Sequence, residues 1–172
     1  MSIDTKRGLR HIAHNPAAII IDMQKDFLKS VPEAQKLVHS QGKVISYCRQ
    51  NNIPVAAVEY VYHGKTINPL RELIKKVPRH NFIAKRQADA FSNPELDEIL
   101  ASWNPDKLLF MGLNATLCVL DAAQSALERG YGVVTAYQLI DDEAYFKKRK
   151  KSLKWYKKNA LYFPDYRSLL KE

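Results

Sequence analysis

Asp22, Lys85 and Cys118 are residues of this sequence whose types could combine into one reaction. Each stands directly or shortly after a short apolar run of the kind that forms a buried strand. A cysteine thiolate is a strong nucleophile, and a carboxylate can take the thiol proton and later protonate a leaving group. A lysine can hold that carboxylate ionised and add positive potential to the site. The three side chains would therefore suit covalent catalysis by a nucleophilic cysteine.

Short apolar runs alternate with amphipathic stretches along the whole chain. The runs, each suited to a strand buried on both faces, are 17–21, 55–58, 82–84, 108–113, 133–136 and 161–163. The helical patterns between them are 33–49, 69–76, 94–102, 117–129 and 141–157. Strands that alternate with helices predict βαβ units, and hence a parallel sheet of about six strands with helices on both faces. The chain is therefore expected to be a single α/β domain, 1–172, with 1–15 as an N-terminal tail.

Ligands of an open parallel sheet bind at the carboxyl ends of its strands. Asp22, Lys85 and Cys118 would meet at this edge. Cys118 would also begin the helix expected over 117–129, where the positive end of the helix dipole lowers a thiol pKa. Backbone N–H groups of the preceding turn could stabilise a developing oxyanion.

Each residue taken alone has a simpler interpretation. An aspartate after a strand is often a helix cap or a turn residue, a lysine is usually exposed, and a cysteine in an apolar segment is often a small core residue. Their expected position at one sheet edge is what favours the catalytic interpretation.

Composition and charge limit the classes of protein to which this chain can belong. With 46% hydrophobic and 26% charged residues the chain is typical of a globular protein, and no apolar run is long enough to cross a bilayer. The segment 1–15 is polar and basic and lacks the apolar stretch of a secretory signal, so a cytoplasmic location is expected. Cys48 and Cys118 form no disulfide framework and would be free thiols, with Cys48 packed inside a helix.

Much of the net charge of +9 lies in the segment 147–158, which holds eight lysines and arginines. Such a run is usually the solvated face of a helix, and the alternative is a patch that binds an anionic partner.

Three segments of the sequence resemble the motifs of the isochorismatase-like cysteine hydrolases, a superfamily that includes nicotinamidases, N-carbamoylsarcosine amidases and isochorismatases. The first is Ala18 to Phe27 (AIIIDMQKDF), with Asp22. The second is Lys85 to Phe91 (KRQADAF), followed by Asn93, Leu96 and Leu100. The third is Gly112 to Val119 (GLNATLCV), which continues through Ala122, Ala123, Ala126 and the stretch 130–134.

The resemblance implies a three-layer αβα sandwich with a mostly parallel, six-stranded, Rossmann-like sheet, assembled as a homodimer or homotetramer. It implies that Cys118 attacks a carbonyl carbon, with Asp22 as base and then acid and Lys85 as the third member of the triad. The backbone N–H groups of Asn114 and Cys118 would form the oxyanion hole, beside a cis peptide bond between Leu113 and Asn114.

Two departures from the family pattern bear on the substrate. Metal-containing nicotinamidases carry an Asp-x-His pair where this chain has Tyr60 and Tyr62. No metal or other cofactor is therefore expected, and nicotinamide is a weaker candidate substrate. If the alignment is shifted, Glu59 or His63 could still serve as a metal ligand, so the question of a metal stays open. Asn114 stands where small apolar or hydroxyl residues are usual.

Four aromatic residues are candidates to line a substrate pocket, with ordinary core packing as the alternative for each. They are Phe27, Tyr60, Tyr62 and Phe91.

The favoured function is cysteine-dependent hydrolysis of a small amide or related C–N bond through a thioester. The alternatives are isochorismatase-type hydrolysis of an ether, a non-catalytic binding protein that uses the basic surface of 147–158, and a thiol that acts in redox or transfer chemistry. A small-molecule substrate is expected, with no membrane partner and no nucleic acid. The sequence leaves the natural substrate open.

Overall fold

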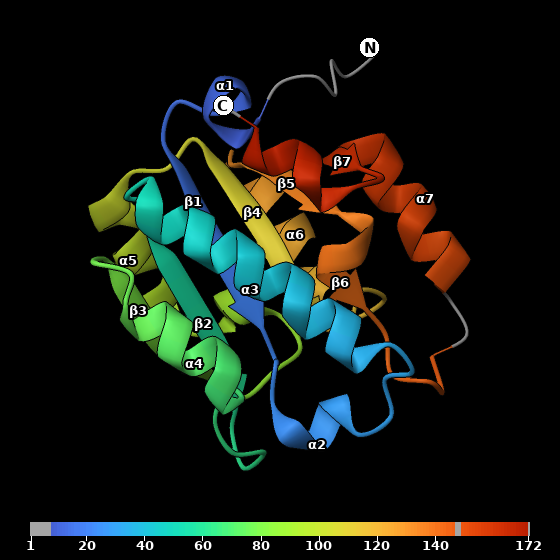
Figure 1. The fold of residues 1–172 in the computed structure, drawn as a ribbon. Coiled ribbons are helices and arrows are strands. Elements are labelled where there is room, and N and C mark those ends of the chain that lie inside the picture. Colours follow the sequence, from blue (N-terminus) through green and yellow to red (C-terminus); the bar gives the residue numbers. More distant parts are fainter. Residues whose placement is uncertain (1–7, 147–148, 172) are drawn as a thin grey trace.

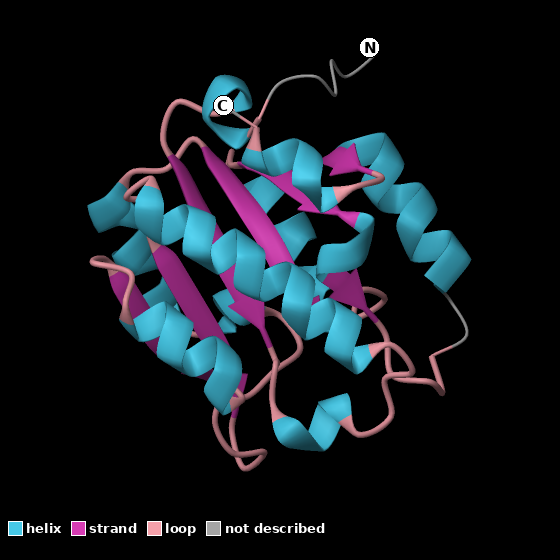
Figure 2. Cartoon of the chain, viewed as in Figure 1, coloured by secondary structure: helices cyan, strands magenta, loops and turns pink. Residues whose placement is uncertain are grey.

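A parallel sheet of seven strands forms the centre of the molecule in the computed structural model, which describes residues 8–146 and 149–171 (Figure 2). The strand order is β3-β2-β1-β4-β5-β7, and β6 pairs with the end of β4. Every pairing between these strands is parallel. The strands are β1 (Pro16–Ile21), β2 (Val55–Tyr60), β3 (His80–Lys85), β4 (Lys107–Leu113), β5 (Gly132–Ala136), β6 (Ile140–Asp141) and β7 (Leu161–Phe163).

Helices cover both faces of the sheet, as Figure 1 shows. One hydrophobic cluster joins the sheet to α1 (Leu9–Ile12), α3 (Ala34–Gln50) and α4 (Asn68–Lys75). A second cluster joins the other face to α5 (Pro94–Trp103), α6 (Cys118–Glu128) and α7 (Arg149–Asn159). The short α2 (Lys25–Leu28) follows β1. The α/β fold with a mostly parallel sheet between helices is therefore confirmed.

The central strand β1 shows why the apolar runs are nearly continuous. Ala18 and Ile20 belong to the first cluster, whereas Ala17, Ile19 and Ile21 belong to the second. Successive side chains of a strand point to opposite faces, so a strand covered on both sides must be apolar at every position.

The structure corrects three details of the sequence-based prediction. The sheet has β6 in addition to the six strands expected. The helix expected over 141–157 is described over Arg149–Asn159, and residues 140–141 form β6, which pairs with β4, instead. In the expected tail 1–15, the described part is packed, since α1 buries Leu9 and Ala13 follows it into the core. None of the helices in the described part of the chain is long and apolar enough to span a membrane.

Gly112 lets β1 and β4 approach each other at the carboxyl edge of the sheet. It pairs with Ile21, has a φ of +132°, and a Cβ built on it would lie 2.1 Å from the carbonyl oxygen of Ile21. Any side chain here would collide with backbone, so glycine is required directly before the turn that leads to Cys118.

We expect Gly112→Ala to lower the free energy of unfolding by about 3 kcal/mol or more, because the backbone of β1 must move. Gly130→Ala is the matched control: Gly130 also has a positive φ, of +88°, but a Cβ there would meet nothing within 4 Å. It should cost only the conformational strain, about 1–2 kcal/mol. Urea unfolding followed by circular dichroism measures both, and equal losses would contradict the proposed collision.

Candidate active site

Asp22, Lys85 and Cys118 converge at the carboxyl edge of the sheet. Asp22 follows β1, Lys85 ends β3, and Cys118 begins α6. Their exposed fractions are only 2%, 1% and 5%. The Nζ of Lys85 lies 2.8 Å from Oδ2 of Asp22, and the Cys118 thiol interacts with both residues. Three reactive groups far apart in the sequence thus form one buried cluster.

The strand order explains how Lys85 reaches Asp22. Because β2 lies between β3 and β1, the long lysine side chain must pass the end of β2, and its Nζ lies 5.1 Å from the ring centroid of Tyr60. The ammonium group also donates to the carbonyl oxygen of Ala88 at 2.7 Å. The backbone of Asp22 is also fixed. It has a positive φ of 54°, and its N–H donates to the carbonyl oxygen of Val58.

The second carboxylate oxygen of Asp22, Oδ1, is buried and has no hydrogen-bond partner of ordinary geometry among the described residues. Burial raises the pKa of Asp22, and the charge of Lys85 opposes that rise. A buried carboxylate with a raised pKa and a free oxygen is a stronger base than an exposed one.

The Cys118 thiol differs from the expectation of a lowered pKa at a helix N-terminus. Burial, followed by the negative charge of Asp22, raises the pKa of Cys118 to about 12, and Lys85 only partly opposes them. Desolvation and a neighbouring carboxylate outweigh the helix dipole here. A thiol with a pKa this high carries its proton near neutral pH.

The turn from β4 to α6 contains the expected cis peptide bond between Leu113 and Asn114. Successive polar groups of this turn form hydrogen bonds. The N–H of Ala115 donates to the carbonyl oxygen of Asp141, and the carbonyl oxygen of Ala115 accepts from the hydroxyl of Tyr156. The N–H of Thr116 donates to the carboxylate of Asp142 at 2.8 Å.

Two N–H groups of this turn stand apart from that pattern. The carbonyl oxygen of Asn114 accepts from Leu117 and Val119, whereas the N–H groups of Asn114 and Cys118 donate to no acceptor among the described residues. These are the donors expected to form an oxyanion hole, and the geometry leaves them available.

The residues that hold the turn, Asp142 and Glu143, were missed by the sequence analysis. Both are buried, and Glu143 bonds to the side chain of Asn114. The available signal was an acidic run, 141–143, directly after apolar Leu139 and Ile140, which does not fit the basic helix expected there.

The four candidate pocket residues divide into two pairs. Phe27 and Tyr60 pack on His63, with ring centroids 4.7 Å and 5.7 Å from the imidazole, and Tyr60 also contacts Lys85. Tyr62 is 88% exposed, and Phe91 is buried in the core, where Arg129 covers its ring. The structure thus places Tyr60 beside Lys85, packs Phe27 against Tyr60, and adds His63, which lies 3.6 Å from Asp26.

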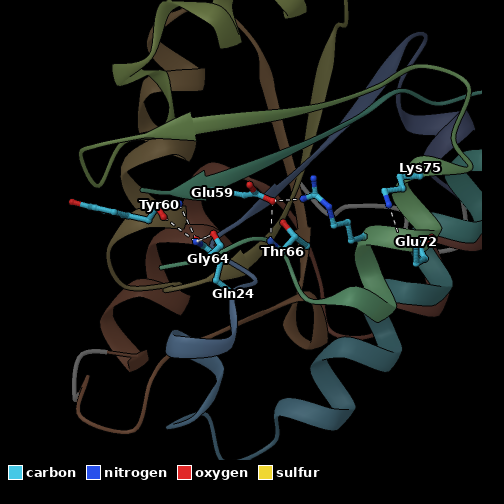
Figure 3. A network of polar contacts seen from close by, with 8 residues as sticks. Gln24, Glu59, Tyr60, Gly64, Thr66, Glu72 and Lys75 are labelled. Carbon is cyan, nitrogen blue, oxygen red and sulfur yellow. Dashed lines mark hydrogen bonds and ion pairs between the residues drawn. The ribbon is translucent and has the colours of Figure 1, made fainter. Parts of the chain in front are cut away.

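Tyr60 and the loop after it, for which the sequence left a metal site open, belong to a network of polar contacts within the protein, drawn in Figure 3. The side chain of Gln24 bonds to the backbone of Tyr60 and Gly64, and Oε1 of Glu59 accepts from the N–H of Thr66 and from Arg71. In the residues that the structure describes, no group of three His, Cys, Asp or Glu side chains is arranged to hold a metal ion. Glu59 thus serves to hold the loop after β2.

The basic segment 147–158 is described in part. Lys151, Lys154, Lys157 and Lys158 are exposed on α7, whereas Lys147 and Lys148 and the side chains of Arg149 and Lys150 lie outside the described residues.

The structure brings a buried aspartate, lysine and cysteine together at the carboxyl edge of a parallel sheet that lies between two helical layers. Residues 16–139 match the family model of the isochorismatase domain. The chain therefore belongs to the isochorismatase family, and it is a hydrolase.

One relative is similar to this chain in sequence, and two solved structures are similar to it in fold. Isochorismatase family protein 2A of Dictyostelium discoideum is 25% identical over 163 residues, which cover 90% of this chain and 80% of the relative. A ribonuclease of Caenorhabditis elegans has the same fold, with a TM-score of 0.81, 18% identity, and coverage of 91% of this chain and 79% of that chain. A nicotinamidase of Staphylococcus aureus has a TM-score of 0.79 and 20% identity, over 88% of this chain and 98% of that chain.

Alkylation by iodoacetamide should report the charge of Asp22 on Cys118. Because the pKa of Cys118 is about 12, the thiolate fraction and the rate should rise about tenfold per pH unit between pH 7 and 10, without a plateau. In Asp22→Asn the negative charge is removed and Lys85 remains, so the pKa should fall and the rate at pH 8 should rise at least about tenfold.

Mass spectrometry of the Cys118 peptide measures both rates, and Cys48 is the internal control. Cys48 is fully buried and its pKa is also raised to about 12 by burial, so it should react only in urea. A slower reaction in Asp22→Asn would contradict the electrostatic account.

Proposed function

We propose that this protein hydrolyses a small amide or a related C–N bond through a thioester on Cys118. The observation that carries the proposal is the buried cluster of Asp22, Lys85 and Cys118, in which the thiol is close enough to the carboxylate for their charges to interact. A nucleophile, a base within reach and a third group that orients the base form the arrangement that covalent catalysis requires.

In the first half of the reaction the Cys118 sulfur attacks the carbonyl carbon while its proton passes to Asp22. Asp22 then gives this proton to the amide nitrogen, the C–N bond breaks, and ammonia or an amine leaves the thioester. In the second half water attacks the thioester and loses a proton to Asp22. That proton returns to the sulfur as the carboxylic acid is released.

Lys85 and the free N–H groups would stabilise the charges that appear on this path. The ammonium group of Lys85 opposes the effect of burial on Asp22 and so keeps the carboxylate ionised before attack. The N–H groups of Asn114 and Cys118 would donate to the carbonyl oxygen as it becomes an oxyanion. Preorganised donors of this kind contribute about 3 kcal/mol each to stabilising a transition state.

The substrate class rests on two further observations. The fold shared with a solved nicotinamidase makes amides the first compounds to test. The tyrosines at 60 and 62, in place of an Asp-x-His pair, direct the search away from nicotinamide itself. Phe27 and Tyr60 are proposed to contact the substrate, since Tyr60 lies beside Lys85 and Phe27 packs against Tyr60. Cytoplasmic location and assembly as a homodimer or homotetramer remain predictions.

Ammonia release from a panel of small amides tests the proposal. The panel holds nicotinamide, pyrazinamide, carbamoylated amines and short aliphatic amides. We expect turnover of at least one, its loss in Cys118→Ala, and a fall of at least about a hundredfold in Asp22→Asn, where the base is removed. Cys48→Ala is the matched control and should retain activity, because Cys48 is packed in α3.

Release that persists in Cys118→Ala would contradict the thioester mechanism. No release from any amide would redirect the assay to ethers, as in isochorismatase-type hydrolysis, and to binding of anionic partners by the basic segment.

A further inference from the structure

Glu143 is a buried carboxylate that the proposed reaction does not use, and its contacts come from two other segments as well as its own loop. Its Oε2 accepts from Nδ2 of Asn114 at 2.9 Å, and its backbone N–H donates to Oδ1 of Asn114 at 2.8 Å. Its Oε1 accepts from the hydroxyl of Ser30 at 3.2 Å. The exposed fractions of Glu143 and Asn114 are 6% and 5%. The two residues therefore form a reciprocal, desolvated pair.

The pair joins the active-site turn to the loop that follows α2. The residue after Glu143 bonds to the same serine, since the N–H of Ala144 donates to the carbonyl oxygen of Ser30 at 2.9 Å. Oε2 of Glu143 also accepts from the hydroxyl of Tyr145 at 2.7 Å. Each of these donors is uncharged, so the Glu143 side chain is held by directed hydrogen bonds, which require a fixed geometry.

Asn114 is the residue whose orientation matters most to an oxyanion hole. Its side chain is held at both polar atoms by Glu143, and its carbonyl oxygen is held by the N–H groups of Leu117 and Val119. With these groups fixed, the direction of its own free N–H is fixed as well. A small error in the direction of such a donor costs much of its effect on the transition state.

We propose that Glu143 is a positioning residue that sets the oxyanion donor of Asn114 by holding its side-chain amide. The inference rests on the proposed function, because it assumes that Cys118 attacks a carbonyl carbon. Glu143 itself does not touch the substrate. It acts through Asn114, and the asparagine that departs from the family pattern has its role as the partner of Glu143.

A reversible aldehyde adduct tests this role without knowledge of the substrate. The Cys118 sulfur adds to the aldehyde carbon, the C=O π bond opens, and the thiol proton ends on the oxygen as a hemithioacetal. That oxygen occupies the oxyanion hole, whereas alkylation by iodoacetamide creates no such oxygen. The assay measures the rate of Cys118 alkylation and the concentration of butyraldehyde or benzaldehyde that halves it.

In Glu143→Ala we expect the half-protecting aldehyde concentration to rise about tenfold or more, while the alkylation rate without aldehyde stays within about twofold of wild type. Glu143→Gln should restore protection, because its amide oxygen can accept from Asn114 and its NH₂ group can donate to Ser30. Tyr145→Phe is the matched control: it removes one bond to Glu143 but leaves the Asn114 pair, so protection should be unchanged.

The double variant Glu143→Ala with Asn114→Ala separates positioning from a general structural effect. If Glu143 acts through Asn114, the double variant should lose no more protection than Asn114→Ala alone. Additive losses would overturn the proposal, as would full protection in Glu143→Ala or a failure of Glu143→Gln to restore it. If wild-type Cys118 is alkylated but no aldehyde protects it, the proposed carbonyl chemistry fails first, and the inference fails with it.

Discussion

The buried ion pair between Lys85 and Asp22 is the interaction on which the rest of this site depends. Taking two charges out of water costs several kcal/mol, and such a pair is often no more stabilising than apolar residues of the same size. Its presence is therefore better explained by chemistry than by stability. The pair needs Asp22 at the end of β1, Lys85 at the end of β3, and a sheet whose order places only β2 between them. It also affects Cys118, since the negative charge of Asp22 contributes to the raised pKa of the thiol.

The turn that carries Cys118 is held by contacts other than this ion pair. Neighbouring segments form hydrogen bonds with the polar groups of Asn114, Ala115 and Thr116. Gly112 allows close contact with β1, Tyr156 and the 141–143 segment hold Ala115 and Thr116, and Glu143 holds Asn114. The N–H groups of Asn114 and Cys118 are left without an acceptor among the described residues. In the proposed mechanism both would donate to the oxyanion. The acidic segment that holds the turn is short and begins within β6, which pairs with the end of β4. The strand thus fixes the support of the site as well as extending the sheet.

The fold and the convergence of Asp22, Lys85 and Cys118 could be predicted because they rest on local signals. Apolar runs such as 17–21 must be strands covered on both faces, and reactive residues directly after them must lie at one edge. The rest depends on contacts between distant segments. The pairing of Glu143 with Asn114 links residues 29 positions apart, and no periodicity marks it. The helix expected from Asp141 failed for the same reason, because pairing with β4 overrides the local pattern. The pKa of Cys118 was misjudged because the helix dipole is visible in the sequence, whereas burial and the distance to Asp22 are not.

The most direct test of the central claim is to trap the thioester. The enzyme is mixed with an amide that it hydrolyses, and the reaction is quenched in acid within one turnover. The protein is then digested, and the mass of the peptide that contains Cys118 is measured by mass spectrometry. We predict a mass increase equal to the acyl group on Cys118, formed before ammonia release is complete and absent from the peptide that contains Cys48. Turnover without any adduct on Cys118, at a rate that Cys118→Ala does not change, would contradict the account.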